Sequence, residues 1–264
     1  VPGHEGAGEV IAVGEGVEEF RPGDRVAYVG ALGGYSEARN ISAASLVHLP
    51  KSFSYATGAV MMLKGLTAQY LLRRTFRVKK GHRVLVHAGA GGVGQLLCQW
   101  ASALGAKVIA TVGSQEKAEI AHHAGAKHVI LYREEDFVQR VREITKGRLC
   151  DVVYDGVGAA TFPASLDCLA PFGMFVSFGS ASGPVAAFDL GLLAQKSLYA
   201  ARPSLFTHIA DRRVYEDMIE DLEHAIKRGH LNLDVAASFP LAEAAKVHAA
   251  LEARQTVGSI VLTP

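Results

Sequence analysis

The sequence has few cysteines, no excess of charge of one sign and no long uninterrupted apolar run. Its 3 cysteines, Cys98, Cys150 and Cys168, are widely spaced and form no C-x-x-C pair. A structural zinc site built from four clustered cysteines is therefore excluded, and no disulfide framework is indicated. We expect three buried thiols in a protein of the reducing cytoplasm.

The near-neutral charge removes two classes of partner. The formal net charge is +1, and the basic residues cluster only in short groups such as Lys79-Lys80 and Arg212-Arg213. Such a chain has no general attraction for nucleic acid or an anionic membrane. The stretch 84–106 is uncharged, but its glycines, His87, Gln95 and Gln99 interrupt it, so we expect no membrane span.

The first fifty residues predict β structure. The chain opens with Val1-Pro2-Gly3-His4 and has no initiator Met, so we expect it to be N-terminally incomplete. Residues 8–14 and 25–29 are predicted to be strands, with a turn at 22–24 between them. This segment predicts a small antiparallel or barrel-like unit.

The middle of the chain alternates between strand and helix patterns. The predicted strands cover residues 83–88, 107–112, 128–132, 151–154, 172–178 and 197–201. Six strands separated by helices predict an α/β fold with a doubly wound parallel sheet. The tail predicts a helix over 214–228, a helix ending at Leu251 and a strand over 258–262. We expect the tail strands to complete the N-terminal β unit, with the α/β region inserted between.

A glycine-rich turn connects the first strand of this region to the next helix. In VLVHAGAGGVG, residues 84–94, the segment Gly89 to Gly94 fits the pattern G-x-G-x-x-G. In that pattern the glycines allow a tight turn, close approach of a pyrophosphate and contact of helix with strand. Unpaired N–H groups at the helix start then hold the phosphate. The flanking strand and helix favour a dinucleotide site over a glycine-rich turn without a ligand.

The end of the second strand favours a particular dinucleotide. An acidic residue there would bind the ribose of NAD, whereas a 2′-phosphate needs a nearby cation. The strand ends in Val112-Gly113-Ser114, Lys117 follows within a turn, and Tyr132-Arg133 ends the third strand. We therefore expect NADPH. In the alternative, Lys117 is a solvated helix residue and Glu116 binds the ribose of NADH.

Seven segments in order resemble the quinone oxidoreductase branch of the zinc-independent medium-chain dehydrogenase/reductase superfamily, the zeta-crystallin-like proteins. They are LKGLTAQYLL, AGAGGVG, GSQEKAE, YREEDF, VVYDGVG, VSFGSASG and RPSLF. The resemblance implies a Rossmann domain, residues 66–204, inserted into an N-terminally incomplete GroES-like β-barrel catalytic domain, residues 1–65 and 205–264. It also implies a cytoplasmic homodimer that reduces a small-molecule quinone with NADPH, and an upstream segment that carries part of the substrate pocket.

The resemblance also implies which residues bind the cofactor, although it assigns no catalytic acid or base. It places Thr67 beside the nicotinamide, Val157 on the adenine side and residues 202–204 over the nicotinamide. The full set is Thr67, Gly91, Gly92, Val93 and Gly94 for the nicotinamide side and pyrophosphate, Ser114, Lys117 and Tyr132 for the 2′-phosphate, and Val157, Phe178, Gly179, Ser180, Arg202, Pro203 and Ser204 for the remaining loops.

One motif departs from this branch. Gly3-His4-Glu5 resembles the GHE motif of zinc alcohol dehydrogenases, in which the histidine binds the catalytic metal. A catalytic zinc needs three protein ligands, and no cysteine lies at residues 61–64, where the zinc branch has one. We therefore expect no metal and interpret His4 and Glu5 as a polar pair in a turn before a strand. His122, His123 and His128 are expected to be surface histidines.

The predicted chemistry is hydride transfer that relies on orientation in a dry cleft. No Ser-His-Asp arrangement is recognisable, and Cys168 lies in a predicted helix without a nearby base, so acyl transfer is not indicated. Two alternatives stay open. One is reduction of the C=C bond of an enone or enoyl thioester with the same cofactor, and the other is a protein that binds NADPH without catalysis.

Overall fold

A computed structural model describes residues 1–253, 256 and 258–264. The chain divides into two compact units. Unit 1 comprises residues 1–67, 208–223 and 233–264, and unit 2 comprises residues 68–207 and 224–232. The domain limits expected from the sequence, 1–65 with 205–264 and 66–204, stay a prediction.

Unit 2 is built on a six-stranded parallel sheet, in the order β6-β5-β4-β7-β8-β9. Its strands are β4 (Arg83–His87), β5 (Lys107–Val112), β6 (His128–Leu131), β7 (Cys150–Asp155), β8 (Leu169–Ser177) and β9 (Tyr199–Ala201). All six predicted strands are present, which confirms the doubly wound Rossmann arrangement. The order reverses between β4 and β7, and in such sheets ligands bind at this point, beyond the carboxyl ends of the strands.

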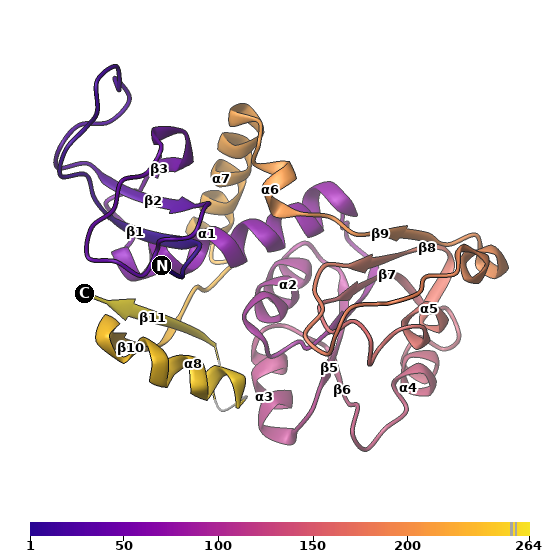
Figure 1. Cartoon of the computed structure of the whole chain (residues 1–264). Helices are drawn as coiled ribbons and strands as arrows, with labels where there is room; N and C mark the ends of the chain where they lie inside the picture. Colours follow the sequence, from indigo (N-terminus) through magenta and orange to yellow (C-terminus); the bar gives the residue numbers. More distant parts are fainter. Residues whose placement is uncertain (254–255, 257) are drawn as a thin grey trace. The chain divides into compact units, whose positions relative to one another are not determined.

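Helices cover both faces of this sheet. Figure 1 shows α2 (Gly92–Ala103) and α3 (Gln115–His123) on one face and α4 (Phe137–Ile144) and α5 (Ala164–Asp167) on the other. The central strands are therefore buried on both sides, which explains why they are continuous apolar runs. The side chains of β4 and β7 that are fully buried are Val84, Leu85, Val86, Cys150, Val152, Val153, Tyr154 and Asp155.

The three cysteines are buried in unit 2, as expected. Cys98 lies in α2 and Cys150 in β7, whereas Cys168 lies in a turn directly after α5 and not inside a helix. Burial raises the pKa of the Cys98 and Cys150 thiols to about 12. Burial also raises the pKa of Cys168 far above its usual value.

Unit 1 begins with a three-stranded antiparallel sheet, β1 (Glu5–Glu9), β2 (Arg25–Val29) and β3 (Leu46–His48), with a 3-10 turn η1 (Ala43–Ser45) before β3. The prediction of a strand over residues 8–14 was wrong, because β1 starts and ends earlier. The strand that pairs with β1 is β2, which begins only at Arg25. The antiparallel pairing therefore ends near Val10, whose N–H donates to the carbonyl of Asp24 in the turn before β2. Ile11 is then exposed.

The tail forms its own sheet. Strands β10 (Val235–Pro240) and β11 (Ser259–Thr263) pair with each other in parallel, and the short turn η4 (Leu241–Glu243) and helix α8 (Ala244–Glu252) lie between them in the chain. The tail strands belong to unit 1 together with the N-terminal strands, although in the described part of the chain they pair with each other and not with β1, β2 or β3. A parallel pair needs a crossover connection, and α8 provides it.

Two long helices belong partly to each unit. Helix α1 (Tyr55–Tyr70) continues as a π-helical turn, η2 (Leu71–Thr75), and the Tyr154 hydroxyl donates to the Leu71 carbonyl at 3.0 Å. Helix α7 (Arg212–Lys227) matches the helix predicted over 214–228.

The remaining elements are η3 (Leu190–Lys196) and α6 (Leu205–His208). Within the described part of the chain, no helix combines the length and apolar character needed to cross a membrane.

Candidate dinucleotide-binding site

The glycine loop connects β4 to α2. Ala88 follows His87 with a positive φ of 55°, and its carbonyl accepts the Gly91 N–H at 2.9 Å. A Cβ atom on Gly94 would lie 2.2 Å from the Ala88 oxygen, so only glycine allows α2 to begin this close to the strand.

The start of α2 is open to an anion. Gly91 is the N-cap residue, and no side chain of the described residues caps the helix there. The first-turn N–H groups of Gly92, Val93 and Gly94 therefore face the end of the loop with the positive end of the helix dipole. This arrangement suits a pyrophosphate.

The three residues predicted at the 2′-phosphate lie around Gly113. Ser114 is the N-cap of α3, and its hydroxyl oxygen accepts the Lys117 N–H at 3.4 Å. This leaves the hydroxyl proton free to donate. The Tyr132 hydroxyl lies over Gly113, since a Cβ atom there would be 2.8 Å from the phenol oxygen. The structure thus brings a serine hydroxyl, a tyrosine hydroxyl and the backbone of a lysine to the carboxyl ends of β5 and β6.

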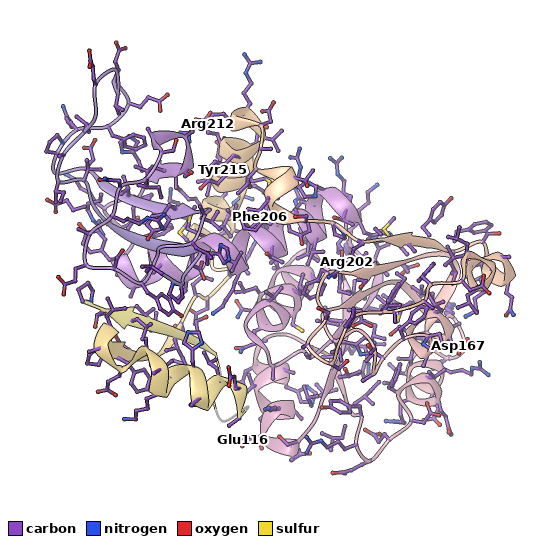
Figure 2. All side chains as sticks on the ribbon, in the orientation of Figure 1. Glu116, Asp167, Arg202, Phe206, Arg212 and Tyr215 are labelled. Atoms are coloured by element: carbon purple, nitrogen blue, oxygen red, sulfur yellow. The ribbon has the colours of Figure 1, made fainter. Side chains whose placement is uncertain are left out.

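Residues 178, 179 and 202 form a second group, beyond β8 and β9. The Phe178 and Gly179 N–H groups donate to the Asp155 carbonyl at 2.9 and 3.3 Å. The Arg202 guanidinium donates to the carbonyls of Ser177 and Gly179 at 2.8 and 3.3 Å, and Figure 2 labels this side chain just after β9. Arg202 is therefore already engaged with the Ser177 to Gly179 loop.

The other predicted residues differ in their surroundings. The Val157 N–H donates to the Asp155 carboxylate at 2.8 Å. Ser180 and Ser204 are exposed, and Pro203 is partly buried. Thr67 belongs to unit 1, where its buried hydroxyl donates to the Leu63 carbonyl at 2.7 Å. Its position beside the nicotinamide stays a prediction.

A buried chain of polar side chains, which the sequence pattern did not reveal, lies beneath these loops. Asp155, Ser165 and His87 do come together, but the serine lies in the middle and all three side chains are buried. A serine without access to substrate cannot act as a nucleophile, so acyl transfer is still not indicated. The available signal was a charged residue, Asp155, at the end of an otherwise apolar strand.

The interpretation of Glu5 as part of a turn was wrong. Glu5 is the first residue of β1, and its carboxylate accepts the Leu63 N–H of α1 at 2.7 Å. Burial raises the pKa of Glu5 to about 7, against the opposing effects of that hydrogen bond, Lys64 and His4. His4 does precede the strand, and its Nδ1 lies 2.8 Å from the Gly30 carbonyl oxygen.

No group of three or more His, Cys, Asp or Glu side chains is placed to hold a metal ion in the part of the chain that the structure describes. His122 Nδ1 lies 2.9 Å from the Ala126 carbonyl oxygen and His123 Nδ1 lies 2.7 Å from that of Glu119. These two side chains thus contact the backbone around α3.

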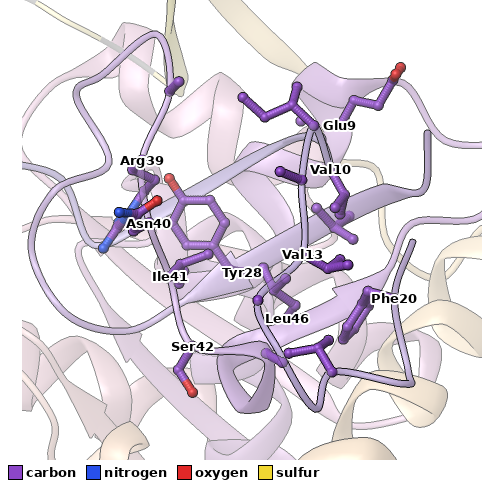
Figure 3. Close-up of a pocket in the computed structure, with 18 of the residues that line it drawn as sticks. Glu9, Val10, Val13, Phe20, Tyr28, Arg39, Asn40, Ile41, Ser42 and Leu46 are labelled. Carbon is purple, nitrogen blue, oxygen red and sulfur yellow. The ribbon is translucent and has the colours of Figure 1, made fainter. Parts of the chain in front are cut away.

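A separate groove of about 1070 Å³ lies in unit 1, between the segment after β1 and the segment that leads to β3. Figure 3 shows that apolar side chains dominate it, with Val10, Val13, Phe20, Ile41 and Leu46 among those labelled. Arg39 lies at one side, 5.1 Å from the centre of the Tyr28 ring. Among the described residues, none of those predicted to bind the cofactor lines this groove.

Two family models match the chain. Residues 1–73 match "Alcohol dehydrogenase GroES-like domain", and residues 92–224 match "Zinc-binding dehydrogenase". Together with the Rossmann sheet and the glycine loop, these matches define a medium-chain dehydrogenase/reductase, with the GroES-like part that the sequence resemblance implied.

Individual proteins that are similar to this chain show to which branch of that superfamily it belongs. The chain is 50% identical to quinone oxidoreductase of Pseudomonas aeruginosa, over 99% of this chain and 81% of that protein. It is 45% identical to 2-haloacrylate reductase of a Burkholderia species, over 100% of this chain and 81% of that protein. The crystal structure of Escherichia coli quinone oxidoreductase complexed with NADPH superposes with a TM-score of 0.96 at 48% identity, over 100% of this chain and 82% of that one. The chain belongs to the quinone oxidoreductase family.

The position of Glu5 predicts how stability depends on pH. The pKa of Glu5 is raised from 4.5 to about 7 in the folded state, so the folded protein binds this proton more tightly than the unfolded protein does. Protonation of Glu5 therefore stabilises the fold. This contribution to stability is fully present below pH 4.5 and is lost as the pH rises to 7. Glu5→Gln keeps an oxygen that can accept the Leu63 N–H but does not titrate, so its stability relative to wild type should rise by about 1 to 3 kcal/mol between these pH values.

The measurement is urea unfolding of both proteins between pH 4.5 and 8. Glu9→Gln is the matched control, since Glu9 lies on the same strand and is exposed. Parallel stability profiles for Glu5→Gln and wild type would show that the Glu5 carboxyl group is not perturbed by burial.

Proposed function

We propose that this protein is an NADPH-dependent quinone reductase, which transfers a hydride to a quinone without a metal. The observation that carries the proposal is the uncapped start of α2 against the Ala88 carbonyl, with a serine, a lysine and a tyrosine at the ends of the neighbouring strands. The close relatives of the chain are quinone oxidoreductases, and one of them has been crystallised with NADPH.

The residues present fit a phosphorylated dinucleotide. The first-turn N–H groups of α2 would hold the pyrophosphate, because they are unpaired donors at the positive end of a helix. The Ser114 and Tyr132 hydroxyls and the Lys117 ammonium would hold the 2′-phosphate, because an anion of this kind prefers charge-assisted hydrogen bonds. Gly91, Gly92, Val93, Gly94, Phe178, Gly179, Arg202 and the other loop residues named above complete the proposed site.

The bound cofactor supplies the hydride, and the protein contributes binding, orientation and exclusion of water. A quinone that accepts a hydride on oxygen becomes a hydroquinone anion, which is stabilised by the aromatic ring and takes its proton from water. The reaction therefore needs no strong acid in the site, and orientation of the two reactants supplies most of the rate enhancement.

We further propose the finer features that the resemblance implies: a cytoplasmic location, the division into a catalytic domain of residues 1–65 and 205–264 and a Rossmann domain of residues 66–204, and a homodimer. For the homodimer, β9 is the edge strand of the sheet of unit 2. Tyr199 on this strand is 57% exposed, and Leu190, the first residue of the preceding turn η3, is also exposed. An unpaired edge with exposed apolar side chains is suited to pairing with a second copy.

Reduction of an activated C=C bond is the second candidate function, because the chain shares 45% identity with a protein named 2-haloacrylate reductase. An assay of NADPH oxidation against ortho- and para-quinones and one enone, with and without a strong chelator, separates the possibilities. We expect turnover of quinones that the chelator does not affect. Turnover of the enone alone would support the second candidate, binding without turnover would indicate a non-catalytic protein, and loss of activity with chelator would show that a metal takes part.

Lys117→Glu tests the cofactor preference. Because the substitution places a carboxylate where the 2′-phosphate is proposed to bind, the KM for NADPH should rise by about tenfold or more, while the KM for NADH changes little. Lys127→Glu is the charge-matched control, since Lys127 is exposed just before β6, at the amino ends of the strands and not at the carboxyl ends where the proposed site lies. An unchanged KM for NADPH in Lys117→Glu would rule out the proposed 2′-phosphate site.

Tyr199→Arg tests the dimer. We expect sedimentation velocity to show a dimer for wild type and a shift toward monomer for the variant, because a desolvated charge at the strand edge opposes pairing. Leu251→Arg, an exposed position on α8, is the control and should sediment as wild type. A dimer of unchanged affinity in Tyr199→Arg would exclude β9 as the interface.

A further inference from the structure

Four buried polar side chains form a continuous chain of hydrogen bonds through the sheet of unit 2. Asp155, Ser165, His87 and Thr111 are each no more than 2% exposed. The Ser165 oxygen lies 3.2 Å from Asp155 Oδ2 and 3.0 Å from His87 Nε2, and His87 Nδ1 lies 2.9 Å from Thr111 Oγ1. The chain thus joins β7, α5, β4 and β5.

The hydrogen bonds have one consistent direction. Ser165 donates to Asp155 Oδ2, so the His87 Nε2–H donates to the Ser165 oxygen. Nδ1 then accepts from the Thr111 hydroxyl, which requires a neutral imidazole. Burial lowers the pKa of His87, although the nearby Asp155 carboxylate opposes this effect. Burial thus favours the neutral imidazole that this direction of the hydrogen bonds requires.

One end of the chain holds the loops after β7 and β8. Asp155 Oδ1 accepts the N–H groups of Val157 and Gly158 at 2.8 and 2.9 Å. The main-chain oxygen of the same residue accepts the N–H groups of Phe178 and Gly179. A single buried aspartate thus fixes two segments that contain residues of the proposed cofactor site.

The other end holds the glycine loop. His87 is the last residue of β4, and the loop starts at Ala88, which has a positive φ. The Thr111 carbonyl accepts the Gly89 N–H at 3.0 Å, while its hydroxyl bonds to His87. Thr111 therefore contacts the last residue before the loop through its side chain and the second residue of the loop through its main chain.

We propose that Asp155, Ser165, His87 and Thr111 are positioning residues, which preform the cofactor loops by fixing the carboxyl ends of β4, β5 and β7 relative to one another. This inference rests on the proposed function, because the loops matter only if they bind NADPH. A satisfied polar network inside a sheet costs desolvation but defines a unique arrangement. Apolar residues would fill the same space without defining where the loops begin.

Two variants interrupt the chain of hydrogen bonds and change the shape of the core little: Thr111→Val removes one bond, and Ser165→Ala removes two. Thr111→Val replaces the hydroxyl by a methyl group, and Ser165→Ala breaks the link between His87 and Asp155. Thr145→Val is the matched control, because Thr145 is also buried and its hydroxyl also bonds to main-chain groups, but it lies after α4, ahead of β7. Thr111→Ser keeps the hydroxyl and serves as the conservative variant.

The experiment measures the Kd for NADPH by titration calorimetry, the KM values for NADPH and for a quinone, and the thermal midpoint of each protein. Thr111→Val and Ser165→Ala should raise the Kd and KM for NADPH about three- to tenfold, with the quinone KM at saturating NADPH unchanged. Thr145→Val should lower the midpoint without changing NADPH binding. Thr111→Ser should bind NADPH nearly as wild type does.

The outcomes separate this inference from the proposed function. If Thr111→Val and Ser165→Ala lose thermal stability but bind NADPH as wild type does, the network serves only the core and the inference is wrong. Equal weakening by Thr145→Val would also overturn it, since any core defect would then have the same effect. If Ser165→Ala does not fold, the comparison of Thr111→Val with Thr111→Ser decides. Failure of the wild-type protein to bind NADPH would instead reject the proposed function.

Discussion

The contact between the start of α2 and the Ala88 carbonyl is the constraint on which the nucleotide unit depends. The helix can begin there only because Gly94 has no side chain, and its closeness to β4 directs the free N–H groups beyond the end of the sheet. The reversal of strand order between β4 and β7 leaves room beyond those strand ends. The other proposed contacts are then set by where the neighbouring strands end.

Charge is used sparingly in this arrangement. A protein of net charge +1 has no broad positive field with which to attract a dinucleotide phosphate. In the proposed site, backbone N–H groups would match the pyrophosphate, and side-chain charge would be needed only near Ser114, where Lys117 would distinguish NADPH from NADH. Affinity and cofactor preference therefore come from different parts of the loop system.

The features that the sequence predicts are those that local pattern determines. Apolar runs marked all six strands of unit 2, and the G-x-G-x-x-G spacing marked the loop because its geometry depends on a few adjacent residues. Other features depend on residues distant in the chain. The burial of Glu5 requires Leu63 of α1, and the polar chain joins residues 87, 111, 155 and 165. Pattern also indicates that 258–262 is a strand but not which strand pairs with it, so the parallel pairing of β11 with β10 follows only from the structure.

The burial of Cys98, Cys150 and Cys168 has a consequence for an enzyme that handles quinones. Quinones and enones are electrophiles, and the species they alkylate on proteins is the thiolate. Here each thiol is both covered by packed side chains and held protonated, because burial raises its pKa. The folded chain thus offers a quinone no thiolate to react with, and the core that stabilises the sheet also closes this route to inactivation of the enzyme.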